Sequence, residues 1–328
     1  MDFLLQQSVP VKSLILYGGV SLVNGLLSRI VMTKFFFDYP IVLVIFHMAL
    51  TLSLIELGRL IKLFKVQPYT FYRGKDVFVP SLLYSLSQYI LLNSLDGITL
   101  PLFPFIQKFF VLLVIPCYVL LLHRQRPSVQ TLIVLFCVCV GSALSSVYEL
   151  NFDPWALAYS LLALLMLTIS LVLMERLHNQ NNSALELIYM NSFNCLCLFL
   201  LADIVQDEIR DAYMYMQTST SPVFYVCLLS LIVVGALCHA VLIHCITTAN
   251  TLNTAIVHNF TAAIQVLVAY ALSIEVFYDT EPDWNNIFGV ILTMAATAFY
   301  FISERDRELK PQGHLEIQGT KYHRILAQ

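Results

Sequence analysis

The chain has 328 residues, of which 59% are hydrophobic and 12% are charged. This composition is too apolar for an ordinary soluble domain and predicts an all-α polytopic membrane protein. The formal net charge of −3 is small, and we expect a lipid bilayer and no nucleic acid as surroundings.

Ten apolar segments are long enough to cross the hydrocarbon core of a bilayer, which takes roughly 17–25 helical residues. They cover residues 11–33, 40–61, 77–95, 100–122, 129–147, 155–174, 184–204, 222–247, 251–277 and 284–303. The junctions at 96–101 and 248–253 are short, so either pair of neighbours could also be read as one segment. We predict about ten transmembrane helices in a single domain over residues 1–303, followed by a disordered cytosolic tail over residues 304–328.

The charges between the segments support this number. With ten spans, the basic connections share one side with both termini: Arg59, Lys62, Lys65, Arg73, Lys75, Arg124, Arg126 and Arg176, with Arg305, Arg307 and Lys310 in the tail. The opposite connections are mainly acidic, with Asp38, Glu149, Asp153, Asp207, Glu208, Asp211, Asp279, Glu281 and Asp283. Because basic loops stay in the cytosol, both termini are predicted to be cytosolic.

A weak internal repeat divides the chain. Residues 99–120 align with residues 251–272, which places Gln107 opposite Asn259 and Lys108 opposite Phe260. The alignment gives two halves of five spans, near 1–150 and 151–303. Since five is odd, the second half must lie upside down relative to the first. Such a 5+5 inverted repeat, with a site near the midplane, is common among secondary transporters.

Two cations lie inside the predicted spans. Lys108 is about 12 Å into the fourth span by helical rise, too deep to reach the interface easily, so it is expected to face a cavity or an ion-pair partner. Glu56, in the second span, is the candidate partner. Arg29 lies near the end of the first span and either lines the same cavity or reaches the membrane interface.

Amides, a tyrosine and a histidine lie in two other spans. Tyr189 and Asn191 are in the seventh span, and Asn253, His258 and Asn259 follow one stretch of the ninth. Such groups suit the base and sugar of a nucleotide, through ring stacking and hydrogen bonds. The alternative is that they only bond neighbouring helices to one another. His239 and His244 are five residues apart, which does not place them on one helix face as metal ligands.

The chain carries no recognisable catalytic motif: no phosphate loop, no HExxH, no GxSxG and no usefully spaced pair of carboxylates. We therefore predict that it is not an enzyme and that it uses no cofactor and no metal.

Several of these residues resemble motifs of the nucleotide-sugar transporters, in the drug/metabolite transporter superfamily. Ser28-Arg29, which is followed by Thr33, stands where the family has an Asn-Lys element in the first span, and Gln107-Lys108-Phe109 matches an Arg-Arg-Phe element of the fourth. Tyr189-Met190-Asn191 matches a Tyr-Asn element in part, and residues 251–261 match the ninth-span run in form. The chain departs from the family in lacking one of the paired arginines and the ninth-span lysine.

The resemblance implies an antiporter that moves a nucleotide sugar from the cytosol into the lumen of the Golgi apparatus or the endoplasmic reticulum, in exchange for a nucleoside monophosphate. Lys108 and Arg29 would bind phosphate, Tyr189 and Asn191 the base or ribose, and Asn253 and Asn259 the remaining polar groups. Gln107 and His258 are further candidates for substrate binding. The sequence leaves open whether the chain forms a homodimer. The missing cations leave two alternatives open: a carrier of another organic anion or small metabolite, and a non-transporting membrane escort or interaction protein with a degenerate cavity.

Overall fold

The computed structural model describes residues 2–93, 102–122, 129–144, 154–180, 182–219, 221–271 and 284–309. These residues form eleven α-helices and one short π-helical segment, η1. The bounds are α1 Asp2–Arg29, η1 Ile30–Lys34, α2 Pro40–Leu60, α3 Phe71–Asn93, α4 Leu102–Leu121, α5 Val129–Leu144, α6 Pro154–His178, α7 Ala184–Gln206, α8 Glu208–Thr218, α9 Pro222–Ala249, α10 Thr251–Ala271 and α12 Trp284–Leu309.

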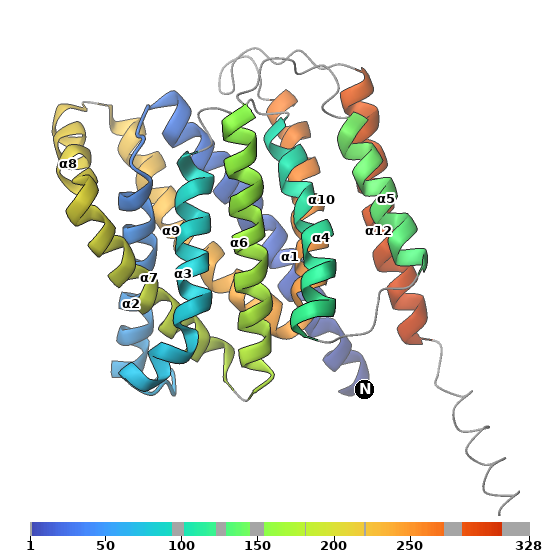
Figure 1. Cartoon of the computed structure of the whole chain (residues 1–328), viewed down its shortest axis with the longest axis horizontal. Coiled ribbons are helices and arrows are strands. Elements are labelled where there is room, and N and C mark those ends of the chain that lie inside the picture. The colour runs from blue at the N-terminus through green and yellow to red at the C-terminus, as the bar shows by residue number, and fades with distance from the viewer. Residues whose placement is uncertain are drawn as a thin grey trace, which may run out of the picture.

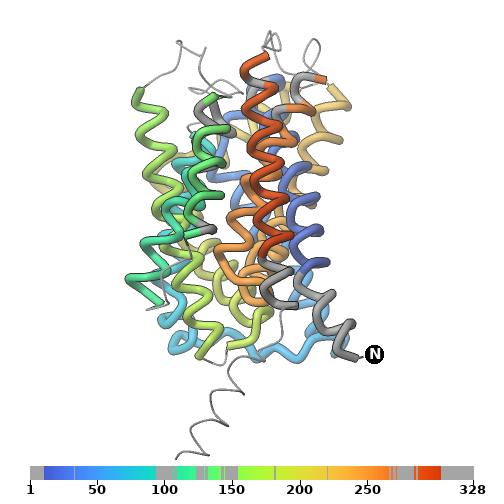
Figure 2. The backbone as a smooth tube through the Cα atoms, turned by 90° about the vertical axis from the view of Figure 1, so that its right-hand side faces the viewer, coloured from blue at the N-terminus to red at the C-terminus, as the bar shows by residue number. Residues whose placement is uncertain are grey.

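The long helices form one bundle in which successive helices run in opposite directions (Figure 1). The N-terminus and the last described turn of α12 lie at the same end of the bundle (Figure 1), and the coloured parts of α1 and α12 run along the bundle in Figure 2. We call that shared end the N-terminal end. Helix α2 begins at the opposite end (Figure 1). Helix α8 lies there too, because its Glu208 carboxylate accepts a hydrogen bond from the backbone N–H of Ile41 at the start of α2.

Local sequence explains where several helices start. Pro40, Pro154 and Pro222 are the first residues of α2, α6 and α9, where a proline loses no helical hydrogen bond. Ser183 caps α7, since its hydroxyl accepts a hydrogen bond from the backbone N–H of Glu186. Asn250 alone separates α9 from α10, with φ at 74°, so the doubtful junction near residue 250 is a true break between two helices.

The hydropathy of the described residues supports a multi-pass helical membrane protein. Five helices are long and apolar enough to cross a bilayer: α1 from Val11, α2, α6, α7 and α9. Three shorter apolar stretches lie in α4, α5 and α12.

Some predicted boundaries differ from the structure. Helix α3 begins at Phe71, six residues before the predicted span, and α6 continues past Met174 to His178. Helix α8 was expected to be part of a loop. Helix α12 continues to Leu309, so the first residues of the predicted disordered tail are helical, while residues 310–328 lie outside the described part of the chain.

The helices pack in a regular set of pairs. Helix α3 packs against α6 and α7, while α9 packs against α1 and α2. Helix α4 packs against α6, and α10 packs against α1. Three further pairs, α2 with α7, α4 with α10 and α5 with α12, complete the contacts that connect the first half of the chain with the second.

An aromatic cluster closes the opposite end. Phe37 is fully buried and its ring contacts Tyr39, Tyr215 and Phe224 at centroid distances of 5.0–5.6 Å. The Tyr215 hydroxyl donates a hydrogen bond to the carbonyl of Phe35. Together with the bond between Glu208 and Ile41, these contacts hold α8 against the start of α2.

Candidate functional site

A polar cluster lies in the middle of the bundle around His239 of α9. Its ring Nδ1 lies 3.0 Å from the Tyr84 hydroxyl of α3, and its Nε2 lies 3.2 Å from the Ser192 hydroxyl and 3.5 Å from Asn191 Nδ2, both on α7. Asn191 and Ser192 are fully buried, and His239 is 3% exposed. Asn191, a residue predicted from the sequence, therefore bonds to a histidine on another helix.

The face of α10 that packs on α1 carries His258. Its Nδ1 lies 3.1 Å from the Tyr17 hydroxyl, and the Phe110 ring of α4 packs edge-on against the imidazole. One turn further, the Thr261 hydroxyl lies against the carbonyl of Gly18 at 3.4 Å. Small residues of α1 let the two helices approach closely here.

The side chain of Asn253 forms hydrogen bonds with two other residues of the chain. Its Nδ2 donates to the carbonyl of Ala249 at 3.0 Å, and its Oδ1 accepts from the Tyr300 hydroxyl of α12 at 3.1 Å. The backbone N–H of Asn253 donates to Asn250 Oδ1 at 2.9 Å, which caps the start of α10. A substrate would have to displace one of these bonds to reach the Asn253 amide.

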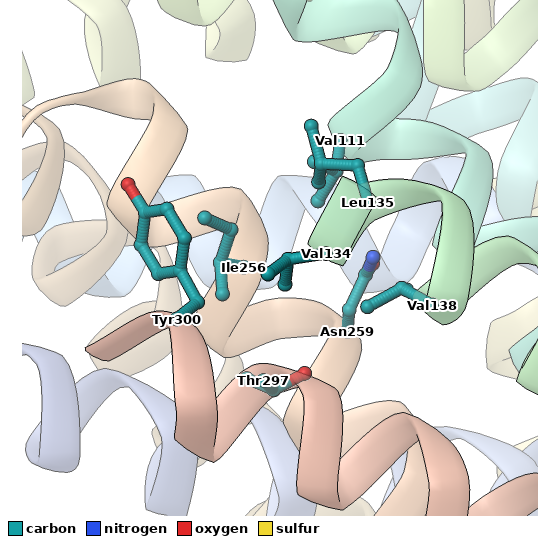
Figure 3. Close-up of a pocket in the computed structure, with 8 residues that line it drawn as sticks. All are labelled: Val111, Val134, Leu135, Val138, Ile256, Asn259, Thr297 and Tyr300. Atoms are coloured by element: carbon teal, nitrogen blue, oxygen red, sulfur yellow. The ribbon is translucent and has the colours of Figure 1, made fainter. Parts of the chain in front are cut away.

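Asn259 lines a small cavity between α4, α5, α10 and α12 (Figure 3). Apart from Asn259, its lining is Val111, Val134, Leu135, Val138, Ile256, Thr297 and Tyr300. With a volume of about 10 Å³, it has room for about one water molecule. A nucleotide does not fit this cavity.

Tyr189 and Glu56 meet near the N-terminal end. The Tyr189 hydroxyl donates to Glu56 Oε1 at 2.5 Å, and Glu56 Oε2 forms an ion pair with Arg59 at 2.7 Å. Tyr189 and Asn191 are neighbours in sequence, but they bind partners on different helices. The structure therefore does not bring them together around one pocket.

A second ion pair and a hydrogen bond join α7 to α3 and the preceding connection at the same end. Arg73 lies 2.8 Å from Glu186, and the Tyr69 hydroxyl donates to Asn194 Oδ1 at 2.9 Å. The Tyr69 ring stacks on Phe193 with a centroid distance of 3.9 Å. Burial raises the pKa of the Tyr69 hydroxyl, so it remains a neutral donor in this bond.

The predicted phosphate-binding residues are placed only in part. Arg29 is the last residue of α1, just before the π-helical segment, and it is half-buried. Gln107 and Lys108 lie in α4 next to the buried residues Ile106 and Phe110, but their side chains lie outside the described part of the structure. The expected pair between Glu56 and Lys108 stays a prediction, and the described partners of Glu56 are Arg59 and Tyr189.

Two buried groups were not identified from the sequence. Glu175 was expected just beyond a span, yet it is 3% exposed and accepts hydrogen bonds at Oε2 from Tyr118, Thr251 N–H and Thr251 Oγ1 at 2.5, 2.9 and 2.6 Å. His47 lies inside the second span, and its Nε2 is buried against Gly235 of α9. Glu175 and His47 could have been found from the sequence, because each is an ionisable residue within or beside an apolar run.

The described polar groups thus connect helices from both halves of the chain. Helices α1, α2, α3, α7, α9 and α10 each contribute a histidine, tyrosine, asparagine or carboxylate. His239 is buried and His244 is exposed, so the two side chains lie in different surroundings. No group of three possible metal ligands occurs among the described residues.

Comparison with known proteins identifies similar sequences and similar solved structures. The chain is 20% identical over 307 residues to "UDP-galactose/UDP-glucose transporter 7" of Arabidopsis thaliana, covering 93% of each chain. No family model matches the sequence. A protein of known crystal structure superposes with a TM-score of 0.62 at 12% identity, over 90% of this chain and 99% of the other. The chain therefore has the fold of a solved protein and distant similarity, over nearly its whole length, to a membrane transporter.

Proposed function

We propose that the chain is a nucleotide-sugar antiporter of the Golgi or endoplasmic reticulum membrane. It would carry a nucleotide sugar from the cytosol into the lumen and return a nucleoside monophosphate by alternating access. The observation that carries this proposal is the similarity to a UDP-sugar transporter across 93% of both chains. A match of that extent includes the helices of both halves and is not confined to one local motif.

The helix contacts support the inverted repeat that such a mechanism uses. If α1 to α5 correspond to α6, α7, α9, α10 and α12, then the pair α3–α6 corresponds to α9–α1. In the same way α4–α6 corresponds to α10–α1, and α3–α7 corresponds to α9–α2. All six of these pairs are in contact, and the pairs α2–α7, α4–α10 and α5–α12 correspond to themselves. This is the pattern expected from two halves related by a two-fold axis.

The topology is part of the same proposal. The first and the last described residues of the chain lie at the same end of the bundle, as an even number of crossings requires (Figure 1). The basic residues Arg59, Lys62, Lys65 and Arg73 lie at or next to the end of α2 and the start of α3, which belong to this N-terminal end. Basic loops face the cytosol, so the N-terminal end would be cytosolic.

In this proposal Lys108 and Arg29 neutralise the phosphates, because charge-assisted contacts are the strongest available in a dry cavity. Asn191, Asn253 and His258 bind the base, ribose or sugar after giving up bonds that they make in the described structure, and Asn259 binds beside them. The hydrogen bonds around Tyr189, Asn253 and His239 would then be remade in each transport cycle. Such exchange gives these side chains a hydrogen-bond partner in both conformations.

Exchange in proteoliposomes tests the proposal. Purified protein is loaded with UMP or GMP and offered a panel of labelled nucleotide sugars. Uptake that depends on one internal nucleotide supports the antiporter and identifies the base. Folded protein that exchanges nothing from the panel, and whose unfolding temperature does not rise in millimolar UMP or GMP, overturns it.

A further inference from the structure

His47 on α2 is a buried imidazole with one nitrogen unused. Its ring forms a hydrogen bond with the backbone at Leu231 of α9, while Nε2 is buried and has no hydrogen-bond partner among the described residues. A buried polar atom without a partner is costly, and in a native protein it calls for a functional explanation. In a neutral ring bonded through the other nitrogen, this atom is a free lone pair, which is a proton acceptor.

The unused nitrogen faces the α9 backbone. A Cβ built on Gly235 would lie 2.3 Å from His47 Nε2, so the ring rests directly on the glycine. Gly235 is one helical turn before His239, and charges on His47 and His239 would repel each other. The contact between α2 and α9 therefore brings two histidines together in the core.

The bonds of His239 fit a neutral ring. The amide Nδ2 of Asn191 is a donor, so Nε2 is an acceptor there, and Nδ1 carries the proton that is donated to the Tyr84 hydroxyl. An added proton on Nε2 would point at the Asn191 amide hydrogens. Protonation of this ring therefore requires the Asn191 amide and the Ser192 hydroxyl to turn, which changes the contact between α7 and α9.

The titratable neighbours on the other helices do not compensate a positive charge. Tyr84 on α3 faces His239, and Tyr17 on α1 lies near Tyr84 and Cys238. Cys195 on α7 contacts the Asn191 amide and lies near Tyr84. These neighbours are neutral hydroxyl and thiol groups, and an imidazolium buried among them is unfavourable.

We propose that His47 and His239 form a proton-binding site in the core of the bundle. Binding one proton and keeping the packed α2–α9 contact exclude each other, because the packed state buries a cation whose Nε2 has no partner among the described residues. A ligand that binds one conformation better shifts the population toward it. The proton is such a ligand, and it favours the conformation in which α2 has moved off Gly235.

This site is independent of the transported substrate. It adds to the proposed antiporter a dependence of the conformational equilibrium on pH. It would do the same for a carrier of any other solute, so the test below needs no substrate.

The test is a histidine titration of the full chain in nanodiscs. The eight histidines are labelled at Cε1, and their NMR signals are followed from pH 8 to pH 5 in parallel with amide hydrogen exchange. We expect the His47 signal to move to the protonated position as exchange rises in α2 and α9. His239→Gln should shift the midpoint of that change, and the matched control His244→Gln, an exposed site on the same helix, should leave it unaltered.

Two results would overturn the site. One is a His47 signal that stays at the neutral position down to pH 5. The other is a His47 titration that leaves hydrogen exchange in α2 and α9 unchanged. The signal is identified in the wild type by elimination, from the signals lost in single His→Gln variants of the seven other histidines: His123, His178, His239, His244, His258, His314 and His323. The test therefore does not depend on a His47 variant that folds. A failed nucleotide-exchange assay leaves this readout intact, which separates the two proposals.

Discussion

Glu175 of α6 accepts hydrogen bonds from both the backbone N–H and the hydroxyl of Thr251, the first residue of α10. A carboxylate at this position satisfies an amide that has no partner within its own helix and interacts favourably with the helix dipole. Tyr118 of α4 donates to the same carboxylate oxygen at 2.5 Å. One side chain therefore fixes three helices at the end of the bundle where the chain begins.

Replacing Glu175 with alanine should lower the free energy of unfolding by about 2–3 kcal/mol, because three buried donor groups lose their common acceptor. Tyr118→Phe removes one of those donors and should cost about 1 kcal/mol. Lys65→Gln, at an exposed position, is the control. Thermal unfolding in one detergent measures all three, and an Glu175→Ala protein as stable as Lys65→Gln would show that the bonds contribute nothing.

Glu208 should make the docking of α8 depend on pH. Partial burial raises the pKa of its carboxyl from 4.5 to about 7; the Ile41 N–H lowers the pKa, and the nearby carboxylates of Asp38 and Asp203 raise it. The folded protein then binds the Glu208 proton more tightly than the unfolded chain, so stability gained below pH 4.5 is lost as the pH rises toward 7.

The measurement compares the unfolding temperatures of wild type and Glu208→Gln at pH 5 and pH 8. We expect the wild type to lose more stability between these values than the variant, since glutamine does not titrate. Equal losses in the two proteins would mean that Glu208 is not responsible. Hydrogen exchange at Ile41 should rise at pH 8 in step with the loss.

Gly235 should not tolerate a side chain. The added methyl of Gly235→Ala would lie 2.3 Å from His47 Nε2, so the ring or the helix must shift. Overpacking of this kind costs roughly 1–3 kcal/mol. Gly19→Ala on α1 is the matched control, because no atom lies within 4 Å of its added Cβ and alanine favours helix.

We expect Gly235→Ala to unfold at a lower temperature than the wild type and Gly19→Ala to unfold at the same or a higher temperature. If both variants behave alike, the close approach of α2 to α9 at Gly235 is not important for stability.

Lys108→Ala should abolish nucleotide exchange while leaving the level of folded protein near normal. The expectation rests on the depth of Lys108 in α4 and on the need of a phosphate for a positive partner. Arg29→Ala tests the second cation, and Lys65→Ala serves as the exposed control. Rates of exchange are measured in proteoliposomes at equal protein density, and transport that survives Lys108→Ala would rule out its phosphate role.

The sequence predicts which polar residues lie inside the bundle but not which residues they bind. Asn191, His258 and Asn259 were identified as polar residues within apolar runs, and the structure buries Asn191 and Asn259 in the bundle. Their partners were not predictable, because His239, Tyr17 and the small cavity come from segments far away in the chain. The sequence predicts that Tyr189 and Asn191 bind the base or ribose together, yet they bind Glu56 and His239 respectively.

The sequence by itself determined that this protein is a helical membrane protein whose apolar segments are separated by alternating basic and acidic connections. A bilayer core requires about twenty apolar residues with internally satisfied backbone groups, and that requirement is visible locally. Only the tertiary structure decided that Glu175 caps α10, that α8 covers the start of α2 and that His47 rests on Gly235. These pairings depend on the tilt and rotation of each helix, which are set by packing against its neighbours and leave no local pattern in the sequence.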